Sequence, residues 1–485
     1  MKLTNFDFPV MSSWFRFKGA RLDSKPYLSG ALEAGVQLEK LRVKKQPLHE
    51  VTTGIYHAGR EGRKYVDNPE YGVPFLGSTD ILASDLSSLP FLSKKQVEAN
   101  PLFVLQEEWT LVTRSGTVGR MAFVRSDMAG MACSEHVMRV VPDPDKILPG
   151  YLYAYLSSKF GVPQVVEGTY GAIIQHIEPH HIADLPVPIA PKDIQEKVHD
   201  LIKEMALLRT ESAKEYQQAT TTLFNAIGIV DPARYTWLSD KRRKSFSVKH
   251  LSSGTLRALN YDPSYIELCS NLQKHRYDKL GELCDPRHFK SGIIFKRIDA
   301  EPTFSVKLIG QREAAQVRPE GRWISQKSIE GLGLIVPQGT TILAAHGTLG
   351  ETELYCRSTY VTKRTSEYAF SGDFVRCLPI ESRILPGYLF AFLRSETAFR
   401  ILRCISIGGK QQAPHPELLW NIPVPRLSTE QEQEIHTLVE SGSRKFDRSL
   451  QFEEDAWNLD EVNDVLFRHF GDVLNERGNL KESAR

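Results

Sequence analysis

The sequence predicts an α+β protein. Two tandem α/β heads are joined by two long helices, which pair as an antiparallel coiled coil around an internal pseudo-two-fold axis. Three observations lead to this prediction. The ten residues 147–156, ILPGYLYAYL, return as ILPGYLFAFL at 384–393. At the same spacing along the chain, LPVP at 185–188 becomes IPVP at 422–425. A long stripe of apolar residues at helical spacing follows each copy.

Each copy begins with a mixed region of short strands. In the first copy, residues 41–141 hold short β-like runs broken by Gly, Pro, Asn and Asp. Residues 109–113 and 121–124 are predicted strands that flank the turn SGTVG at 115–119. The repeated ILPGYL segment predicts a helix that opens near Pro149, since proline suits the first turn of a helix.

A long helix is predicted to close each copy. In the first copy Ile194, Val198, Leu201 and Met205 step by four and three residues, and Gly228 provides a stop. In the second copy Ser428 with Gln431 forms a capping-box pattern at the start of the helix. Helices of about 35 to 40 residues would be roughly 50 to 60 Å long. Such narrow apolar stripes need a partner, which favours pairing of the two helices. The predicted divisions are a first head at 1–190, a first helix at 191–228, a linker and second head at 229–427, and a second helix with a tail at 428–485.

The likeness between the copies loosens toward their starts. VPFLG at 73–77 corresponds to VKLIG at 306–310, and SGTVG corresponds to HGTLG at 346–350. Ser134-Glu135 is matched with Ser366-Glu367. A repeat of about 240 residues is longer than any solenoid unit, so each copy is a whole domain. A shared skeleton with divergent stretches fits two copies that do one kind of work on different targets.

Composition limits the class of protein. The chain has 485 residues, of which 41% are hydrophobic and 25% charged, with a formal net charge of +2. This is ordinary for a soluble globular protein and neither requires nor excludes nucleic acid. The six cysteines form no CxxC pair, and no long apolar run indicates a membrane span. A cytoplasmic protein is expected.

Two turns in each copy are candidate DNA-binding segments. Base reading needs Arg, Lys, Asn, Gln or other hydrogen-bonding side chains on a rigid scaffold, and glycines let a backbone approach phosphate closely. A hairpin turn and a helix connection are the structural alternatives for these segments. The candidates are Arg114, Ser115, Gly116, Thr117, Arg120, His346, Gly347 and Thr348 in the first turn, and Tyr170, Gly171, Gln175, Gly408, Gly409, Lys410, Gln411 and Gln412 in the second.

Neither catalysis nor a metal site is predicted. The cluster His176, Glu178, His180 and His181 is interpreted as a solvated polar loop, since the second copy does not repeat it. NPEY at 68–71 and DPSY at 262–265 only superficially resemble the NPPY loop of adenine methyltransferases, because both lack the second proline. No glycine fingerprint follows a strand.

With these motifs in order, the chain resembles the specificity subunit of type I restriction–modification systems. The resemblance covers nearly the whole chain and depends on ILPGYL(Y/F)A(Y/F)L, the (S/H)GT(V/L)G turn and the (L/I)PVP exit, each present twice. It implies a non-catalytic recognition subunit whose heads are target recognition domains, each reading half of a bipartite site in double-stranded DNA.

The partners implied are two methyltransferase subunits and, through the complex, restriction subunits. S-adenosylmethionine is expected on the methyltransferase and no cofactor on this chain. Two alternatives stay open. One is a specificity subunit of a related type IIB-like or other phage-defence complex, and the other is a protein scaffold that does not bind DNA.

Overall fold

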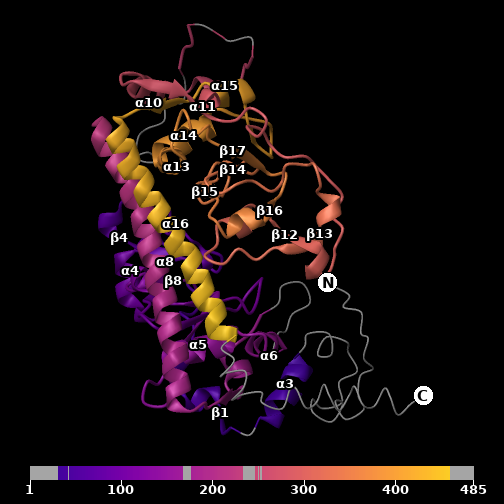
Figure 1. The fold of residues 1–485 in the computed structure, drawn as a ribbon. Coiled ribbons are helices and arrows are strands. Elements are labelled where there is room, and N and C mark those ends of the chain that lie inside the picture. Colours follow the sequence, from indigo (N-terminus) through magenta and orange to yellow (C-terminus); the bar gives the residue numbers. More distant parts are fainter. Residues whose placement is uncertain are drawn as a thin grey trace, which may run out of the picture.

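Two long helices lie side by side along the molecule, with an α/β head against each end of the pair (Figure 1). The computed structural model describes residues 31–41, 43–167, 176–232, 246–249, 251 and 254–458. Helix α8 runs Lys192–Ile227 and α16 runs Thr429–Asn458. We call residues 43–191 the first head and residues 254–428 the second head.

The long helices run in opposite directions. Ser212 Oγ in α8 donates to the carbonyl of Gly442 in α16 at 2.7 Å. Toward the start of α8, Arg209 pairs with Glu453 at 2.6 Å, nearer the end of α16. Gly442 lies at a close approach of the helices, because a Cβ there would come within 2.9 Å of the Tyr216 ring.

Both predicted helix boundaries have the expected local chemistry. Gly228 ends α8 in the left-handed conformation at φ 65°. The predicted capping box precedes α16: the Ser428 amide donates to Gln431 Oε1, and the Gln431 amide donates to Ser428 Oγ, both at 3.3 Å. Both predictions are confirmed.

The first head contains two four-stranded sheets, in the orders β2-β9-β6-β7 and β3-β5-β4-β8. All neighbours are antiparallel except β4 and β8. The strands are β2 Thr52–Tyr56, β3 Tyr65–Val66, β4 Gly72–Leu76, β5 Phe91–Ser93, β6 Thr110–Thr113, β7 Met121–Phe123, β8 Ala132–Cys133 and β9 Val137–Pro142. Among the residues that the structure describes, the helices before α8 are α3 Ala31–Lys40, α4 Lys94–Ala99, α5 Pro149–Ser157, α6 Gly161–Glu167 and α7 Pro179–Ile182.

The second head repeats this plan with three-stranded sheets, in the orders β13-β12-β16 and β15-β14-β17. The strands are β12 Ser305–Ile309, β13 Arg322–Ser325, β14 Thr341–Ala344, β15 Ser358–Tyr360, β16 Ala369–Phe370, β17 Phe374–Cys377, β18 Ser406–Ile407 and β19 Ala413–Pro414. Its helices are α10 Pro263–Gln273, α11 Leu280–Leu283, α12 Gln311–Ala314, α13 Pro386–Leu393, α14 Glu396–Cys404 and α15 Pro416–Trp420.

The proline-flanked exits LPVP and IPVP form short strands, because proline restricts both its own backbone and that of the preceding residue to extended conformations. β10 Pro186–Pro188 pairs with β1 Lys45–Pro47, and β20 Pro423–Pro425 pairs with β11 Tyr277–Lys279. Each exit strand is therefore tied to the beginning of its own copy.

The repeated ILPGYL motif forms the helix that joins each head to the long helices. Helices α5 and α13 begin at its proline, as predicted. Tyr151 Oη donates to the carbonyl of Pro188 at 2.8 Å, and Tyr388 Oη donates to that of Pro425 at 2.7 Å. Both tyrosines are buried, so packing and one buried hydrogen bond in each copy account for the repetition of the motif.

One predicted correspondence between the copies is wrong. Buried Arg139 donates to the carbonyls of Ser134 and Val137, and buried Arg376 donates to those of Ser371 and Phe374. All three pairs keep the spacing that separates the two ILPGYL motifs, so Ser371 and not Ser366 takes the place of Ser134. A dipeptide is too short a match to establish an alignment, and the buried arginine is the true landmark.

Two further observations concern the described part of the chain. No helix there combines the length and apolar character needed to cross a membrane. All six cysteines lie in described segments, and none forms a disulfide.

Candidate nucleic-acid interface

The glycine turn of the first head is shaped by its backbone angles and by one threonine. Gly116 and Gly119 have φ values of 78° and 85°, which favour glycine. Thr113 Oγ1 donates to the Thr117 carbonyl at 2.6 Å and accepts from the Arg120 amide at 3.0 Å. Gly116 and Thr117 are exposed at the tip, while Arg120 is half-buried. The turn is a rigid projection with an open backbone.

The turn of the second head is held differently. It follows β14 and places Thr348 in solvent, with His346 half-buried. A Cβ on Gly347 would come within 2.9 Å of Tyr355 Cβ, so this glycine is required for close packing. The two turns thus present different side chains from one scaffold position.

The two predicted segments meet in each head. Ser115 lies opposite His176 in an antiparallel bridge, and Ser115 Oγ and His176 Nδ1 are 2.8 Å apart. In the second head Gly347 lies opposite Gln412, whose amide donates to the Gly347 carbonyl at 2.8 Å. We call the turn and the loop together the recognition edge of each head. Tyr170, Gly171 and Gln175, which the sequence also suggests, lie outside the described residues.

Two candidate residues do not lie at the surface of this edge. Arg114 is 1% exposed, and its guanidinium donates to the carbonyls of Ile177 and Glu135 and pairs with Glu178. Gln412 is 5% exposed and donates to the carbonyl of Gly408. The guanidinium of Arg114 and the Nε2 group of Gln412 are used within the head, so both side chains brace the edge and offer little to a duplex. This corrects their predicted place at the surface.

The remaining loop residues of the second head are open to solvent. Gly408, Gly409, Lys410 and Gln411 are all exposed, and Gly408 has φ 103°. Arg257 supports the loop by donating to the Gly408 carbonyl at 2.6 Å. Lys410 and Gln411 are therefore accessible hydrogen-bond donors on the recognition edge of this head.

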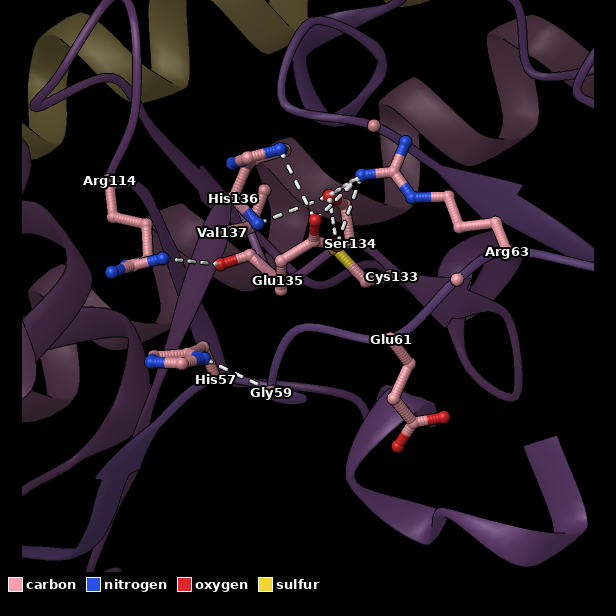
Figure 2. Close-up of polar contacts among 12 residues, drawn as sticks. His57, Gly59, Glu61, Arg63, Arg114, Cys133, Ser134, Glu135, His136 and Val137 are labelled. Atoms are coloured by element: carbon pink, nitrogen blue, oxygen red, sulfur yellow. Dashed lines mark hydrogen bonds and ion pairs between the residues drawn. The ribbon is translucent and has the colours of Figure 1, made fainter. Parts of the chain in front are cut away.

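A polar cluster beside the first turn was missed by sequence reasoning (Figure 2). Arg63 Nη2 pairs with Glu135 Oε2 at 3.0 Å, and His136 Nε2 is 3.3 Å from Glu135 Oε1. Burial opposes the charge on Glu135, yet hydrogen bonds from the backbone and from Arg63 lower its pKa. The cluster adjoins the turn because Arg114 donates its amide to the His136 carbonyl. It adds the donors of Arg63 and His136 to the edge, and Glu135, which is 9% exposed, holds them in place.

The second head has glycine at the position of this carboxylate. The spacing between the ILPGYL motifs puts Gly372 where the first head has Glu135, and the Gly292 amide donates to the Gly372 carbonyl at 3.0 Å. Beyond Gly292 the chain exposes Ile293 and Ile294, the latter 99% exposed, followed by exposed Lys296. One edge is therefore charged and the other apolar and basic. An alignment of the two copies that matches buried Arg139 with buried Arg376 predicts this difference from the sequence.

The motifs that superficially resemble a methyltransferase loop have a structural role. Asn68 caps a short 3-10 helix by accepting from the Glu70 amide at 2.9 Å. Asp262 caps α10 by accepting from the Ser264 amide at 2.8 Å. Both side chains serve as N-caps, which explains the Asx-Pro pattern without chemistry.

The histidine loop is organised by ion pairs. Glu178 pairs with buried Arg114 and lies 3.4 Å from His57 Nε2, while the Glu178 amide donates to His181 Nδ1 at 2.9 Å. Within the described segments, no three His, Cys, Asp or Glu side chains gather into a group that could hold a metal ion.

Each of the two related heads presents an exposed edge, and the two edges differ in chemistry on a common scaffold. Residues 46–218 match the family model of the type I restriction modification DNA specificity domain. The match confirms the resemblance drawn from the repeated motifs. The matched residues cover most of the first head and the larger part of α8, and over that range the chain is similar to a type I restriction modification DNA specificity domain.

Solved structures of such subunits resemble the chain at low identity. The type I S subunit of M. genitalium is 14% identical, with 88% of this chain and 95% of that chain covered and a TM-score of 0.34. The HsdS subunit of Thermoanaerobacter tengcongensis is 13% identical, with 88% and 96% covered and a TM-score of 0.26. A structure described for assembly and conformational transition of the type I R-M system is 15% identical, with 88% and 97% covered and a TM-score of 0.26. No curated protein matches the chain.

Proposed function

We propose that this chain reads a bipartite site in double-stranded DNA, one half with each head, and brings methyltransferase subunits to that site. The observation that carries the proposal is the repetition of whole contacts at one spacing along the chain. Buried Arg139 and Arg376 make the same carbonyl contacts in the two heads. The scaffold is thus duplicated while the recognition edges differ, as two half-sites of different sequence require.

The edges suit base recognition by different means. In the first head Arg63 and His136 are donors, and buried Glu135 holds both of them in place. In the second head Lys410 and Gln411 are exposed donors, and Ile293 and Ile294 suit contact with thymine methyl groups. The glycine turns leave amides free for phosphate.

The paired helices serve as an antiparallel coiled-coil spacer in this proposal. The 36 residues of α8 correspond to about 54 Å at about 1.5 Å per residue. DNA advances about 34 Å per turn, so heads at the two ends can address grooves one turn or more apart. Two methyltransferase subunits would dock on this frame and hold S-adenosylmethionine, and restriction subunits would join through them. This chain itself would bind no cofactor.

Methylation mapping tests the proposal. The chain is combined with the methyltransferase encoded beside it and with a library of random duplexes. Methylation confined to one bipartite sequence is expected, and its absence would defeat the proposal. A non-DNA scaffold would show no salt-dependent affinity for duplex, whereas this chain should lose affinity steeply as salt rises. The gene neighbourhood separates a type I system from a related defence complex.

A further inference from the structure

The two heads touch each other directly, apart from their contacts with the long helices. The Ser84 amide of the first head donates to the Ala315 carbonyl of the second head at 2.9 Å. The Val317 amide of the second head donates to the Leu82 carbonyl of the first at 2.8 Å. These are backbone hydrogen bonds between distant parts of the chain, since Ser84 and Ala315 are 231 residues apart.

The contact pairs a segment with its own counterpart. Phe75 of β4 lies opposite Ala132 of β8, and Leu308 of β12 lies opposite Ala369 of β16, so Phe75 and Leu308 occupy equivalent places. Eight positions further along each copy stand Ala83 and Gln316, and these two residues face each other in an antiparallel bridge. The two backbone hydrogen bonds are therefore symmetry mates, as in the isologous interface of a two-fold dimer. We call residues 82–84 with 315–317 the head clasp.

Side chains reinforce the clasp on both sides. Arg394, at the end of α13, pairs with Asp85 of the first head at 2.7 Å and donates to the Tyr216 carbonyl of α8 at 3.0 Å. Arg318, next to the clasp, lies 3.4 Å from Glu453 in α16. These contacts reach both long helices, so the clasp and the helix pair form one connected frame.

Direct contact between the heads adds a second constraint, beside the paired helices, on the distance between the recognition edges. Long helices commonly curve gently, so a helix pair by itself leaves some freedom in the distance between its ends. Backbone hydrogen bonds hold only within a few tenths of an ångström of about 2.9 Å. We propose that the head clasp, together with the paired helices, fixes the spacing and rotation at which the two half-sites are read, a proposal that rests on the proposed function.

The geometry of the clasp can be tested without DNA. Ala83 and Gln316 form the bridge type without mutual hydrogen bonds, in which Cα atoms lie about 4.5 Å apart, within the range of a disulfide. The double variant Ala83→Cys, Gln316→Cys should close a disulfide on mild oxidation, seen by thiol counting and peptide mapping. The single variants Ala83→Cys and Gln316→Cys are the matched controls and should not. No disulfide in the double variant would overturn the proposal.

Charged substitutions in the head clasp test its effect on the spacing of the two half-sites. Ala83→Asp with Gln316→Asp places two carboxylates opposite each other and should open the clasp, whereas Ala83→Asp with Gln316→Lys should keep it closed. Methylation by the full complex is then mapped on duplexes whose spacer is native or changed by one base pair. The double-Asp variant should relax the preference for the native spacer by about tenfold to thirtyfold, as loss of two hydrogen bonds allows. The Asp–Lys variant should retain the preference.

The outcomes separate the two proposals. Spacer preference that is unchanged in a folded double-Asp complex shows that the clasp does not set spacing, and the inference is wrong. If the disulfide forms but the chain directs no bipartite methylation, the clasp exists and the proposed function is wrong. Relaxed spacing with unchanged half-site sequences supports the inference.

Discussion

The backbone amide of Gly150 donates to Nδ1 of His199 at a distance of 3.0 Å. A Cβ at this glycine would lie 2.8 Å from the Cα of His199, so no larger residue fits. Gly387 and His436 repeat the contact at 3.1 Å in the second copy. The repeated glycine and histidine thus fasten each head to the first turns of its own long helix, and the accepting nitrogen must be unprotonated.

We expect stability to fall in mild acid because of this histidine pair. Burial lowers the pKa of both His199 and His436, although nearby carboxylates oppose the shift. Below the unfolded pKa of about 6.5 the unfolded chain binds more protons than the native chain, so the free energy of unfolding declines as pH falls. Denaturant unfolding at pH 8 and pH 5.5 measures the decline.

Asparagine at both positions separates the effect of histidine protonation on stability from the effect of side-chain packing. His199→Asn with His436→Asn keeps an acceptor near the glycine amides but cannot take up a proton, so the decline between the two pH values should shrink. His180→Asn, at an exposed histidine, should leave the decline unchanged. Equal pH dependence in the double variant and the parent would refute the assignment.

Glu453 is expected to be a sensitive position in the helix pair. It is 1% exposed, pairs with Arg209 at 2.6 Å and accepts from Tyr153 Oη at 2.6 Å. Glu453→Gln leaves the Arg209 charge buried and unpaired, and should cost about 3 to 5 kcal/mol in the free energy of unfolding. Denaturant unfolding measures this loss of stability. The control is the adjacent Glu454→Gln, in a surface ion pair with Arg364, which should cost about 0 to 1 kcal/mol in the free energy of unfolding.

The same carboxylate should remain ionised in acid. Burial opposes its charge, but Arg209 and Arg318 outweigh burial and lower its pKa to about 2. Because the native pKa lies below the unfolded value, this contribution to stability is present above about pH 4.5 and is lost as pH falls toward 2. The slope of stability against pH from 4.5 to 2 should therefore be smaller in Glu453→Gln than in the parent.

Gly442→Ala should weaken the helix pair. Alanine normally stabilises a helix interior over glycine by about 1 kcal/mol. Here the added Cβ would lie 2.9 Å from the Tyr216 ring and 3.2 Å from the Ser212 carbonyl, so the helices must separate. A net loss of about 1 to 3 kcal/mol in unfolding free energy is expected. Thr437→Ala, on the exposed face of α16, is the control and should not destabilise the pair; a more stable Gly442→Ala chain would contradict the close approach.

Lys410→Ala should weaken DNA binding through its charge. The residue is exposed on the recognition edge of the second head, and removal of one phosphate contact should reduce the slope of log affinity against log salt by about 1. Lys95→Ala, at an exposed lysine in α4, should leave the slope unaltered. Titrations at several salt concentrations distinguish the two, and equal slopes for parent and Lys410→Ala would exclude a phosphate contact.

Local patterns explain why parts of the fold were predictable. Ser428 and Gln431 indicate the start of α16, and Gly228 ends α8, because capping depends on residues within one turn. The turn and the loop of the recognition edge were also identified, since glycine marks special backbone angles. The burial of Arg114 was not foreseen, because it depends on the carbonyl of Ile177, 63 residues further along the chain.

The sequence by itself determined the duplication and the two long helices, because repetition and helical periodicity can be seen in the order of neighbouring residues. Tertiary structure alone decided which polar residues face solvent, that Arg63 meets Glu135, and that Ala83 faces Gln316 across the two heads. Those contacts join residues far apart in the chain. Their geometry depends on the packing of the whole chain, and no repeating pattern in the sequence indicates it.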